Sequence, residues 1–356
     1  MEFPTGGLRA DRTAFVVLFV VLLVFTVALV IVSIPAGAYA VYSDRLSPTL
    51  SYNSPFMTYL WIGPAADFPP FGTSIGVMFA LVTSIYVVFL VYSLLQSEGS
   101  IRAVSRSLRE GVSALLSSPF IAILIAIGVL NFGGTLIDSI VTATGSPIGG
   151  PTSQSDPLAL LAGFAYSPLV EELGFRVLLI GVVAFILSIS RPWKVALGAL
   201  WRPSKAIEGL AVGSGASFII WAATGLSAVT FGACHVVCGS TWDIGKLPEA
   251  TFGGLVLGYL YVRYGFHAAV LAHWGVDYFG SALGFFGQAA YGIPWYSGTT
   301  EYTGQLLVDL DMLYLFGLVS FLLAVYLGLR KVVEWRSGRG PDELDKVAVG
   351  GGGVGP

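Results

Sequence analysis

The feature that most constrains this chain is a set of apolar runs, several of them longer than the roughly 18–20 residues that span a bilayer. The first run, residues 14–41, is also longer than a secretory signal core of about 7–15 residues, and no small-residue cleavage site follows it. The chain is 55% hydrophobic and only 11% charged, whereas soluble domains carry about 25% charged residues. These properties predict a polytopic membrane protein.

We predict an all-α bundle of about eight transmembrane helices. The sixth is the shortest, and the fourth and fifth are longer than a straight span requires. A Ser167-Pro168 pair within the fourth predicts an internal helix start, with Ser as N-cap and Pro at the first helical position. The predicted spans are residues 14–41, 73–95, 118–143, 158–189, 209–239, 252–264, 266–287 and 306–329.

The basic residues predict the orientation of the bundle. Fourteen of the 18 Lys and Arg residues fall before the first span or after the second, fourth and eighth spans, which lie on one side. By the positive-inside rule that side is cytoplasmic, so both termini are expected in the cytoplasm. We predict an integral, multi-pass protein of a prokaryotic plasma membrane.

The chain divides into four predicted regions. Residues 1–157 contain the first helices and an external loop, residues 158–287 contain the candidate catalytic core, residues 288–336 contain the last span, and residues 337–356 form a Gly-rich tail that we expect to be disordered. Residues 190–208 are predicted to form an amphipathic segment on the cytoplasmic surface.

Several classes of function are disfavoured. The net charge of −3 and the absence of a basic patch argue against a nucleic-acid partner. No Gly-rich loop precedes a Lys-Ser/Thr pair, so no nucleotide site is expected. Cys234 and Cys238 are interpreted as small packing residues, because two cysteines exclude a disulfide framework; a thiol nucleophile at Cys234 is a weaker alternative.

An acidic cluster within the fourth span carries the first functional signal. Glu171, Glu172 and Arg176 form an EExxxR motif, and each ionised group near a bilayer centre costs roughly 2.5–3.5 kcal/mol unless it is paired or hydrated. Residues four apart share a helix face, so Glu172 and Arg176 are placed to pair. Glu171 lies about 100° away and stays available for proton transfer. The competing interpretation is an ion pair that only joins helices.

Two of the three histidines lie in further apolar segments with a partner four residues away. Phe231 and His235 share one face, and His273 and Asp277 share another. A lone membrane histidine often serves only a bond between helices, but two beside an acidic cluster favour catalysis. The predicted topology places His235 near the outer end of its span and His273 in the inner third of its own, so their meeting requires a broken or shifted fifth span. His267 begins a span and is predicted to be interfacial.

Together the three motifs resemble the CAAX protease and bacteriocin-processing (CPBP) family of intramembrane peptidases, which includes the Ras-converting CAAX endopeptidases. The family pattern is EExxxR, FxxxH and HxxxN or HxxxD on separate membrane helices. The resemblance covers about residues 158–287, with a longer interval between the first and second motifs that suggests an insertion near 190–215.

The resemblance implies an endopeptidase in which Glu171 and His235 activate a water, while His273 and Asp277 stabilise the oxyanion. Glu172, Arg176 and Phe231 would support these residues. No cofactor is required in this mechanism, but Glu171, His235 and His273 are also a possible zinc ligand set, since two His and one Glu occur in catalytic zinc sites. A glutamate-type peptidase and a metallopeptidase therefore both remain open.

The expected substrate is a membrane-anchored or lipidated polypeptide that reaches the site from the bilayer or the cytoplasm. One alternative is a non-catalytic scaffold, or an immunity protein against peptide toxins, with the same fold. Another is a proton-coupled transporter, because Glu, Asp and His within a membrane also form proton relays. A transporter would commonly show an internal repeat, and none is visible.

Overall fold

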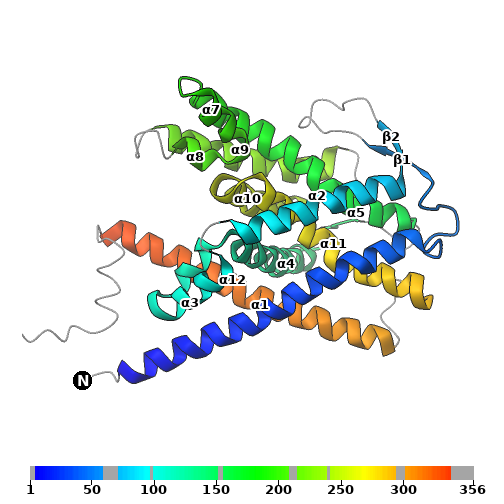
Figure 1. Cartoon of the computed structure of the whole chain (residues 1–356), viewed down its shortest axis with the longest axis horizontal. Coiled ribbons are helices and arrows are strands. Elements are labelled where there is room, and N and C mark those ends of the chain that lie inside the picture. The colour runs from blue at the N-terminus through cyan, green and yellow to red at the C-terminus, as the bar shows by residue number, and fades with distance from the viewer. Residues whose placement is uncertain are drawn as a thin grey trace, which may run out of the picture.

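The computed structural model describes residues 5–58, 71–96, 99–150, 155–207, 215–238, 241–293 and 301–337. The predicted disordered tail lies outside these ranges, apart from Ser337. Almost all of the described chain is helical (Figure 1). The helices before the acidic motif are α1 (Thr5–Tyr42), α2 (Ile75–Leu95), α3 (Ser100–Glu110), η2 (Val112–Ser117), α4 (Pro119–Ala143) and α5 (Pro157–Glu172).

The helices that follow include one π-helical segment, η3 (Leu173–Gly181). They are α6 (Val182–Leu187), α7 (Trp193–Trp201), α8 (Pro203–Ile207), α9 (Gly215–Val237), α10 (Lys246–Tyr264), α11 (Phe266–Tyr291) and α12 (Glu301–Ser337). The predicted segment at 190–208 therefore forms two short helices, α7 and α8. The sixth predicted span begins earlier than expected, at Lys246.

Five described helices are long and apolar enough to cross a membrane. They are Ala14–Tyr42 within α1, Ile75–Leu95, Pro119–Ala143, Gly215–Val237 and Leu313–Val333 within α12. The other three predicted spans correspond to α5–η3–α6, α10 and α11. The chain is a multi-pass membrane protein, while eight spans and two cytoplasmic termini stay predictions.

One small sheet departs from the all-α prediction. Strands β1 (Pro55–Thr58) and β2 (Phe71–Ser74) pair antiparallel, with Pro55 opposite Ser74 and Thr58 opposite Phe71. They lie in the predicted external loop, next to the start of α2 (Figure 1). Short Pro- and aromatic-rich segments gave no alternating pattern from which these strands could be predicted.

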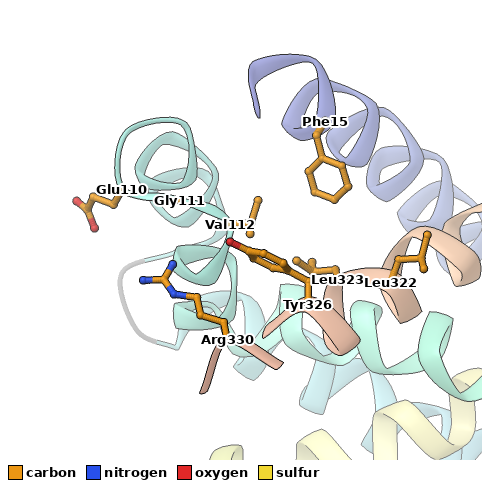
Figure 2. A pocket seen from close by; sticks show the side chains of 8 residues that line it. All are labelled: Phe15, Glu110, Gly111, Val112, Leu322, Leu323, Tyr326 and Arg330. Atoms are coloured by element: carbon orange, nitrogen blue, oxygen red, sulfur yellow. The ribbon is translucent and has the colours of Figure 1, made fainter. Parts of the chain in front are cut away.

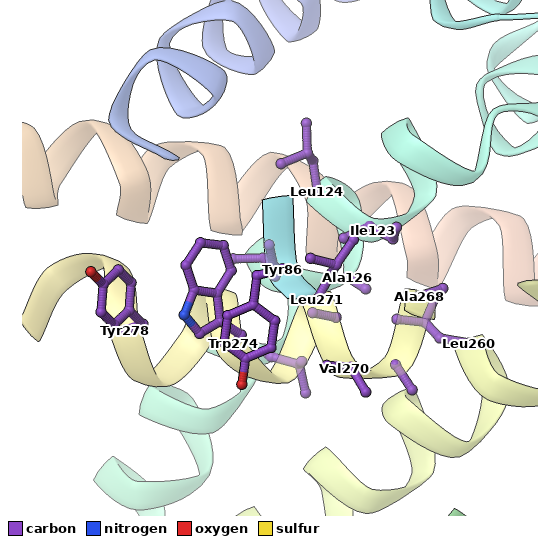
Figure 3. Packing of buried hydrophobic residues seen from close by; sticks show 14 of the residues in the cluster. Tyr86, Ile123, Leu124, Ala126, Leu260, Ala268, Val270, Leu271, Trp274 and Tyr278 are labelled. Carbon is purple, nitrogen blue, oxygen red and sulfur yellow. The ribbon is translucent and has the colours of Figure 1, made fainter. Parts of the chain in front are cut away.

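The core lies around α4 and α11. In α4 every residue from Pro119 to Leu130 is buried, and α4 lies near the centre of the bundle, with α1 and α12 on one side and α9 on the other (Figure 1). Figure 3 shows Tyr86 of α2 and two aromatic residues of α11 within this core. Trp274 stacks on Tyr86 and Tyr278, with ring centroids 4.7 and 4.9 Å apart. This stack fixes the rotation of α11 about its axis.

Helices α9 and α10 pack closely against each other at two glycines of α10. A Cβ atom at Gly254 would lie 2.7 Å from the Cα of Ala228, and one at Gly258 would lie 2.7 Å from Thr224 Cγ2. Small residues let membrane helices approach in this way. These two glycines therefore serve helix packing, and the packing holds α9, which carries Phe231 and His235, against α10.

Candidate active site

The helix that carries the acidic motif departs from regular α-helix both before and after the two glutamates. Asp156 caps α5 by accepting hydrogen bonds from the backbone N–H groups of Leu158 and Ala159, at 2.9 and 3.1 Å. The prediction of a helix start at Ser167-Pro168 is therefore wrong, because Asp156-Pro157 supplies the same N-cap and Pro signal earlier in the chain. Pro168 lies inside α5, where it removes one backbone hydrogen bond.

The π-helical segment η3 begins immediately after Glu172. π-helical turns are rare and occur frequently at functional sites. Glu171 and Glu172 therefore lie between Pro168, which lacks a backbone N–H donor, and η3, in which the backbone hydrogen bonds change from α-helical to π-helical. This irregularity was not evident from the sequence.

The predicted pair between Glu172 and Arg176 is confirmed. Arg176 Nε lies 3.0 Å from Glu172 Oε2, and Arg176 Nη2 donates a hydrogen bond of 3.3 Å to Glu172 Oε1. Both side chains are 0% exposed. Burial of two charges is tolerable only when they are paired and their remaining polar atoms find partners.

Those partners come from α9. Arg176 Nη1 donates to Ser227 Oγ at 3.1 Å, and Ser227 Oγ in turn donates to the backbone oxygen of Phe175 at 2.6 Å. The guanidinium Cζ lies 4.7 Å from the centroid of the Phe231 ring, in a cation–π contact. Ser227 is not among the predicted site residues, although Ser227, Phe231 and His235 follow one another at intervals of four on a single face of α9.

His273 lies between the three carboxylates of the site. Its Nδ1 is 3.0 Å from Glu172 Oε1, and its Nε2 is 3.4 Å from Asp277 Oδ2 and 3.7 Å from Glu171 Oε2. The imidazole of α11 is thus in contact with both glutamates of the EExxxR motif. His273 is nearly buried, with 9% of its side chain exposed.

Glu171 differs from its neighbour in its surroundings. Its side chain is 23% exposed, and its Oε2 atom has no hydrogen-bond partner among the residues that the structure describes. A carboxylate oxygen without a donor is free to accept a proton or to bind a water molecule. Asp277 is exposed to a similar extent, 26%, so these two carboxylates lie on the accessible side of the cluster.

His235 joins the cluster through Phe231. The Phe231 ring centroid lies 4.6 Å from that of His235 and 5.7 Å from that of His273. His235 Nδ1 is 2.9 Å from the backbone oxygen of Phe231. Because a carbonyl oxygen only accepts, Nδ1 carries the hydrogen, and a neutral ring presents the lone pair of Nε2.

The predicted topology placed His235 and His273 at different depths in the membrane, and the structure brings their neighbourhoods together without a broken helix. α9 is continuous from Gly215 to Val237. Phe231 lies about 24 Å along α9 from its start, whereas His273 lies only about 10 Å along α11 from its start, at 1.5 Å per residue. Since the two rings are in contact, α9 and α11 are offset along their axes.

The interpretation of the two cysteines is wrong. Cys234 and Cys238 form a disulfide with a Cα–Cα distance of 4.9 Å, so they are not separate packing residues, and Cys234 is no free thiol nucleophile.

His267 lies at the start of α11, as predicted, and is fully buried. Its ring stacks on Trp201 of α7 at 5.7 Å and contacts Tyr92 of α2 at 4.8 Å. Its position at the membrane interface stays a prediction.

Zinc binding by Glu171, His235 and His273 stays a prediction. Among the residues that the structure describes, no three His, Cys, Asp or Glu side chains form a group that could hold a metal ion. The Nδ1 atoms of His235 and His273 are directed at Phe231 and Glu172, so their Nε2 atoms are the ones that would bind a metal.

The site agrees with a family match. A sequence model described as Rce1-like, type II CAAX prenyl endopeptidase, matches residues 153–279, a little more than a third of the chain. This stretch contains all three motifs, and the resemblance to the CPBP family is confirmed there. No curated protein and no solved structure was found to match the chain.

Proposed function

We propose that this protein is an intramembrane endopeptidase that hydrolyses a peptide bond of a membrane-anchored or lipidated polypeptide. The observation that carries the proposal is the contact of Glu171 with His273 in a cluster whose most buried carboxylate, Glu172, forms an ion pair with Arg176. The Glu171 side chain is 23% exposed, and its buried Oε2 atom accepts no hydrogen bond in the described part of the chain, so this oxygen can still take a proton.

The proposed reaction begins with water activation. Glu171 and the Nε2 atom of His235 bind one water molecule, and one of them takes a proton as the water oxygen attacks the peptide carbonyl. A positioned general base of this kind contributes typically 10²–10⁴-fold to the rate. The C–N bond then breaks, and the same proton passes to the leaving amine, so that no proton is left over.

His273 stabilises the negative charge that develops on the carbonyl oxygen. Its Nδ1 faces Glu172, so His273 donates to the oxyanion through Nε2–H in its doubly protonated form, with Asp277 beside it. In a site that excludes water, one such donor is worth about 2.7–4 kcal/mol of transition-state stabilisation. Glu172, Arg176 and Ser227 hold His273 in place and do not contact the substrate.

The matched family suggests a class of substrate. Its description refers to CAAX prenyl endopeptidases, so a prenylated peptide with a free C-terminus belongs among the candidates, together with peptides anchored by a single apolar helix. We propose that the reaction takes place in a prokaryotic plasma membrane, the location predicted from the sequence.

The test is peptide cleavage by the purified protein in liposomes, with a panel of prenylated and helix-anchored peptides. Wild type is compared with Glu171→Ala and His235→Ala, each with and without a strong chelator and added zinc. We expect cleavage that both substitutions abolish and that the chelator leaves unchanged. Loss on chelation with recovery on added zinc would replace this mechanism with a metallopeptidase. Equal cleavage by wild type and Glu171→Ala would contradict the proposal and favour a scaffold.

A further inference from the structure

Loops that join the helices meet at two ends of the bundle, and one of these ends contains β1 and β2 (Figure 1). There Thr49 donates a hydrogen bond of 3.0 Å to Asp156, the N-cap residue of α5. The backbone N–H of Asp243 donates to the oxygen of Ile148 at 2.8 Å, so the segment after α4 pairs with the segment before α10. We call this end the β end; it comprises residues 43–58, 71–74, 144–150, 155–156 and 241–245.

The opposite end of the bundle carries the short helices α3, η2, α7 and α8. Tyr264, the last residue of α10, donates a hydrogen bond of 2.9 Å to the backbone oxygen of Leu116 in η2. Helices α7 and α8 contact the same end of α10 through two further hydrogen bonds. Figure 2 shows that Val112 of η2 lines one cavity with Phe15 of α1 and Arg330 of α12. We call this end the basic end.

The basic residues indicate which end faces the cytoplasm. Those of α3 and of the α7–α8 region lie at the basic end, and they are Arg102, Arg106, Arg109, Lys194, Arg202 and Lys205. Among the described residues of the β end and of the first turn of α10, the Lys and Arg residues are Arg45 and Lys246. By the positive-inside rule the basic end is cytoplasmic and the β end is extracytoplasmic.

The disulfide supports the same orientation independently of the basic residues. Cys234 lies in the last turn of α9, and Cys238 directly follows this helix, where the chain leads toward residues 241–245 of the β end. Disulfides persist in oxidising, extracytoplasmic compartments and are rare in the cytoplasm. The charges and the disulfide therefore both indicate that the β end lies outside the cytoplasm.

The exposed carboxylates of the active site lie on its β-end side. Helix α11 runs toward the β end, where its last turns are hydrogen-bonded to the loop after α1. The partly exposed Asp277 lies one turn beyond the nearly buried His273 in this direction. Helix α5 runs the other way, from its N-cap at the β end, and the partly exposed Glu171 precedes the fully buried Glu172. In both helices the exposed carboxylate is thus the one nearer to the β end.

Helix α9 ends beside the site. His235 is two residues from Val237, the last residue of α9, which is about 3 Å along the helix axis. The next helix, α10, begins with Lys246, which is partly exposed and pairs with Glu249 at 2.6 Å. The Lys246 ammonium also lies 4.1 Å from the ring centroid of Trp242. A short polar segment, and not a further length of helix, therefore separates His235 from the surface of the β end.

We propose that the active site opens at the β end, on the extracytoplasmic side, and that the peptide bond it cleaves lies on that side of the membrane. The substrate would be a membrane-anchored polypeptide with an exported segment next to its anchor. A prenylated cytoplasmic protein would instead present its cleavable bond at the basic end. The substrate class rests on the proposed function, whereas the side on which the site opens does not.

The first experiment measures thiol accessibility in intact cells that express the full chain. The reagent is a small cationic methanethiosulfonate, trimethylammonium-ethyl methanethiosulfonate, which does not cross membranes. Cys234 and Cys238 are joined, so each single-cysteine variant has one free thiol. Glu171→Cys and Asp277→Cys report on the site. The matched references are Thr142→Cys, exposed in the last turn of α4 beside the β end, and Ser105→Cys, exposed in α3 at the basic end.

We expect Thr142→Cys, Glu171→Cys and Asp277→Cys to react as fully in intact cells as after permeabilisation, and Ser105→Cys to react only after permeabilisation. The inference is overturned if Thr142→Cys reacts only after permeabilisation. It is also overturned if both site variants react only then, or in neither condition. Two site variants on different helices guard against misfolding of one of them.

The second experiment separates this inference from a failure of the proposed function. A peptide that the purified protein cleaves in liposomes is placed next to one apolar anchor helix, on its extracytoplasmic or its cytoplasmic side, in cells that express wild type or Glu171→Ala. We expect wild type to cleave the extracytoplasmic segment alone, and Glu171→Ala to cleave neither. Cleavage of the cytoplasmic segment alone would overturn the inference and leave the proposed function standing. If the liposome assay yields no cleaved peptide, the proposed function and the substrate class both fail, and thiol accessibility still decides where the site opens.

Discussion

Glu171 and Glu172 are adjacent and identical in chemistry, yet the fold gives them opposite surroundings. Glu172 is fully buried and lies 3.0 Å from both Arg176 and His273, whereas Glu171 is partly exposed and lies 3.7 Å from His273. A buried ion pair contributes to the structure that holds the site, and a carboxylate with a longer contact at the partly exposed edge contributes to chemistry. We therefore predict that substitution of Glu172 mainly lowers stability, whereas substitution of Glu171 mainly lowers activity.

The largest expected effect on stability comes from Arg176→Met. This substitution leaves the buried Glu172 with His273 as its remaining partner, and loss of one partner of a buried ion pair costs about 3–5 kcal/mol of unfolding free energy. Thermal unfolding in detergent should show a large fall in Tm. The double variant Glu172→Gln with Arg176→Met removes both charges and should recover part of the loss. A wild-type Tm for Arg176→Met would show that the ion pair of Glu172 with Arg176 does not stabilise the fold.

His273 contacts both glutamates, so its substitution should affect both activity and stability. His273→Gln should lower kcat by about 10²–10³-fold, because it removes the proposed oxyanion donor. It should also lower Tm, though by less than Arg176→Met, because Glu172 loses one partner and keeps Arg176. Steady-state cleavage and thermal unfolding on the same preparation measure both effects. A change in KM alone would argue against the oxyanion role.

Ser227→Ala tests the structural role of the buried Glu172–Arg176 pair without changing a proposed catalytic residue. Arg176 Nη1 would lose its acceptor within a buried site, and an unsatisfied group of this kind costs about 1–3 kcal/mol. We expect a moderate fall in Tm, with kcat close to wild type at temperatures where the protein is folded. Ser227→Thr, which retains the hydroxyl, is the matched control.

The smallest effect should come from the exposed pair of Arg106 and Glu110, which has the same spacing as Arg176 and Glu172. Because solvent screens this pair, Glu110→Gln should leave both Tm and cleavage unchanged. A fall in Tm as large as that of Arg176→Met would mean that burial does not distinguish the two pairs.

The sequence was sufficient for those parts of the site that depend on spacing along one helix. The contact of Glu172 with Arg176 follows from an interval of four residues, and the three motifs marked the helices that meet. The contact of Glu172 with His273 could not be derived in this way, because it depends on how α5 and α11 pack. The offset of α9 against α11 is likewise a tertiary property, and it resolved the conflict in depth.

Other features had no local signal, or a signal that was assigned to the wrong residues. The π-helical segment after Glu172 reflects bonding that no residue pattern specifies. The Asp156-Pro157 start was missed because Ser167-Pro168 carries the same signature nearer to the motif. The disulfide of Cys234 and Cys238 was dismissed on the number of cysteines, although an interval of four residues brings Cys238, directly after the end of α9, next to Cys234 in its last turn.

The most direct test of this account compares Glu171→Gln with Glu172→Gln, in one cleavage assay and one thermal unfolding assay. We predict that Glu171→Gln keeps the wild-type Tm and loses about 10²–10⁴-fold in kcat/KM. Glu172→Gln should lower Tm markedly, because Arg176 is left without its counter-ion. Normal cleavage by Glu171→Gln, or equal effects of both substitutions on Tm, would contradict the division of roles between the two glutamates.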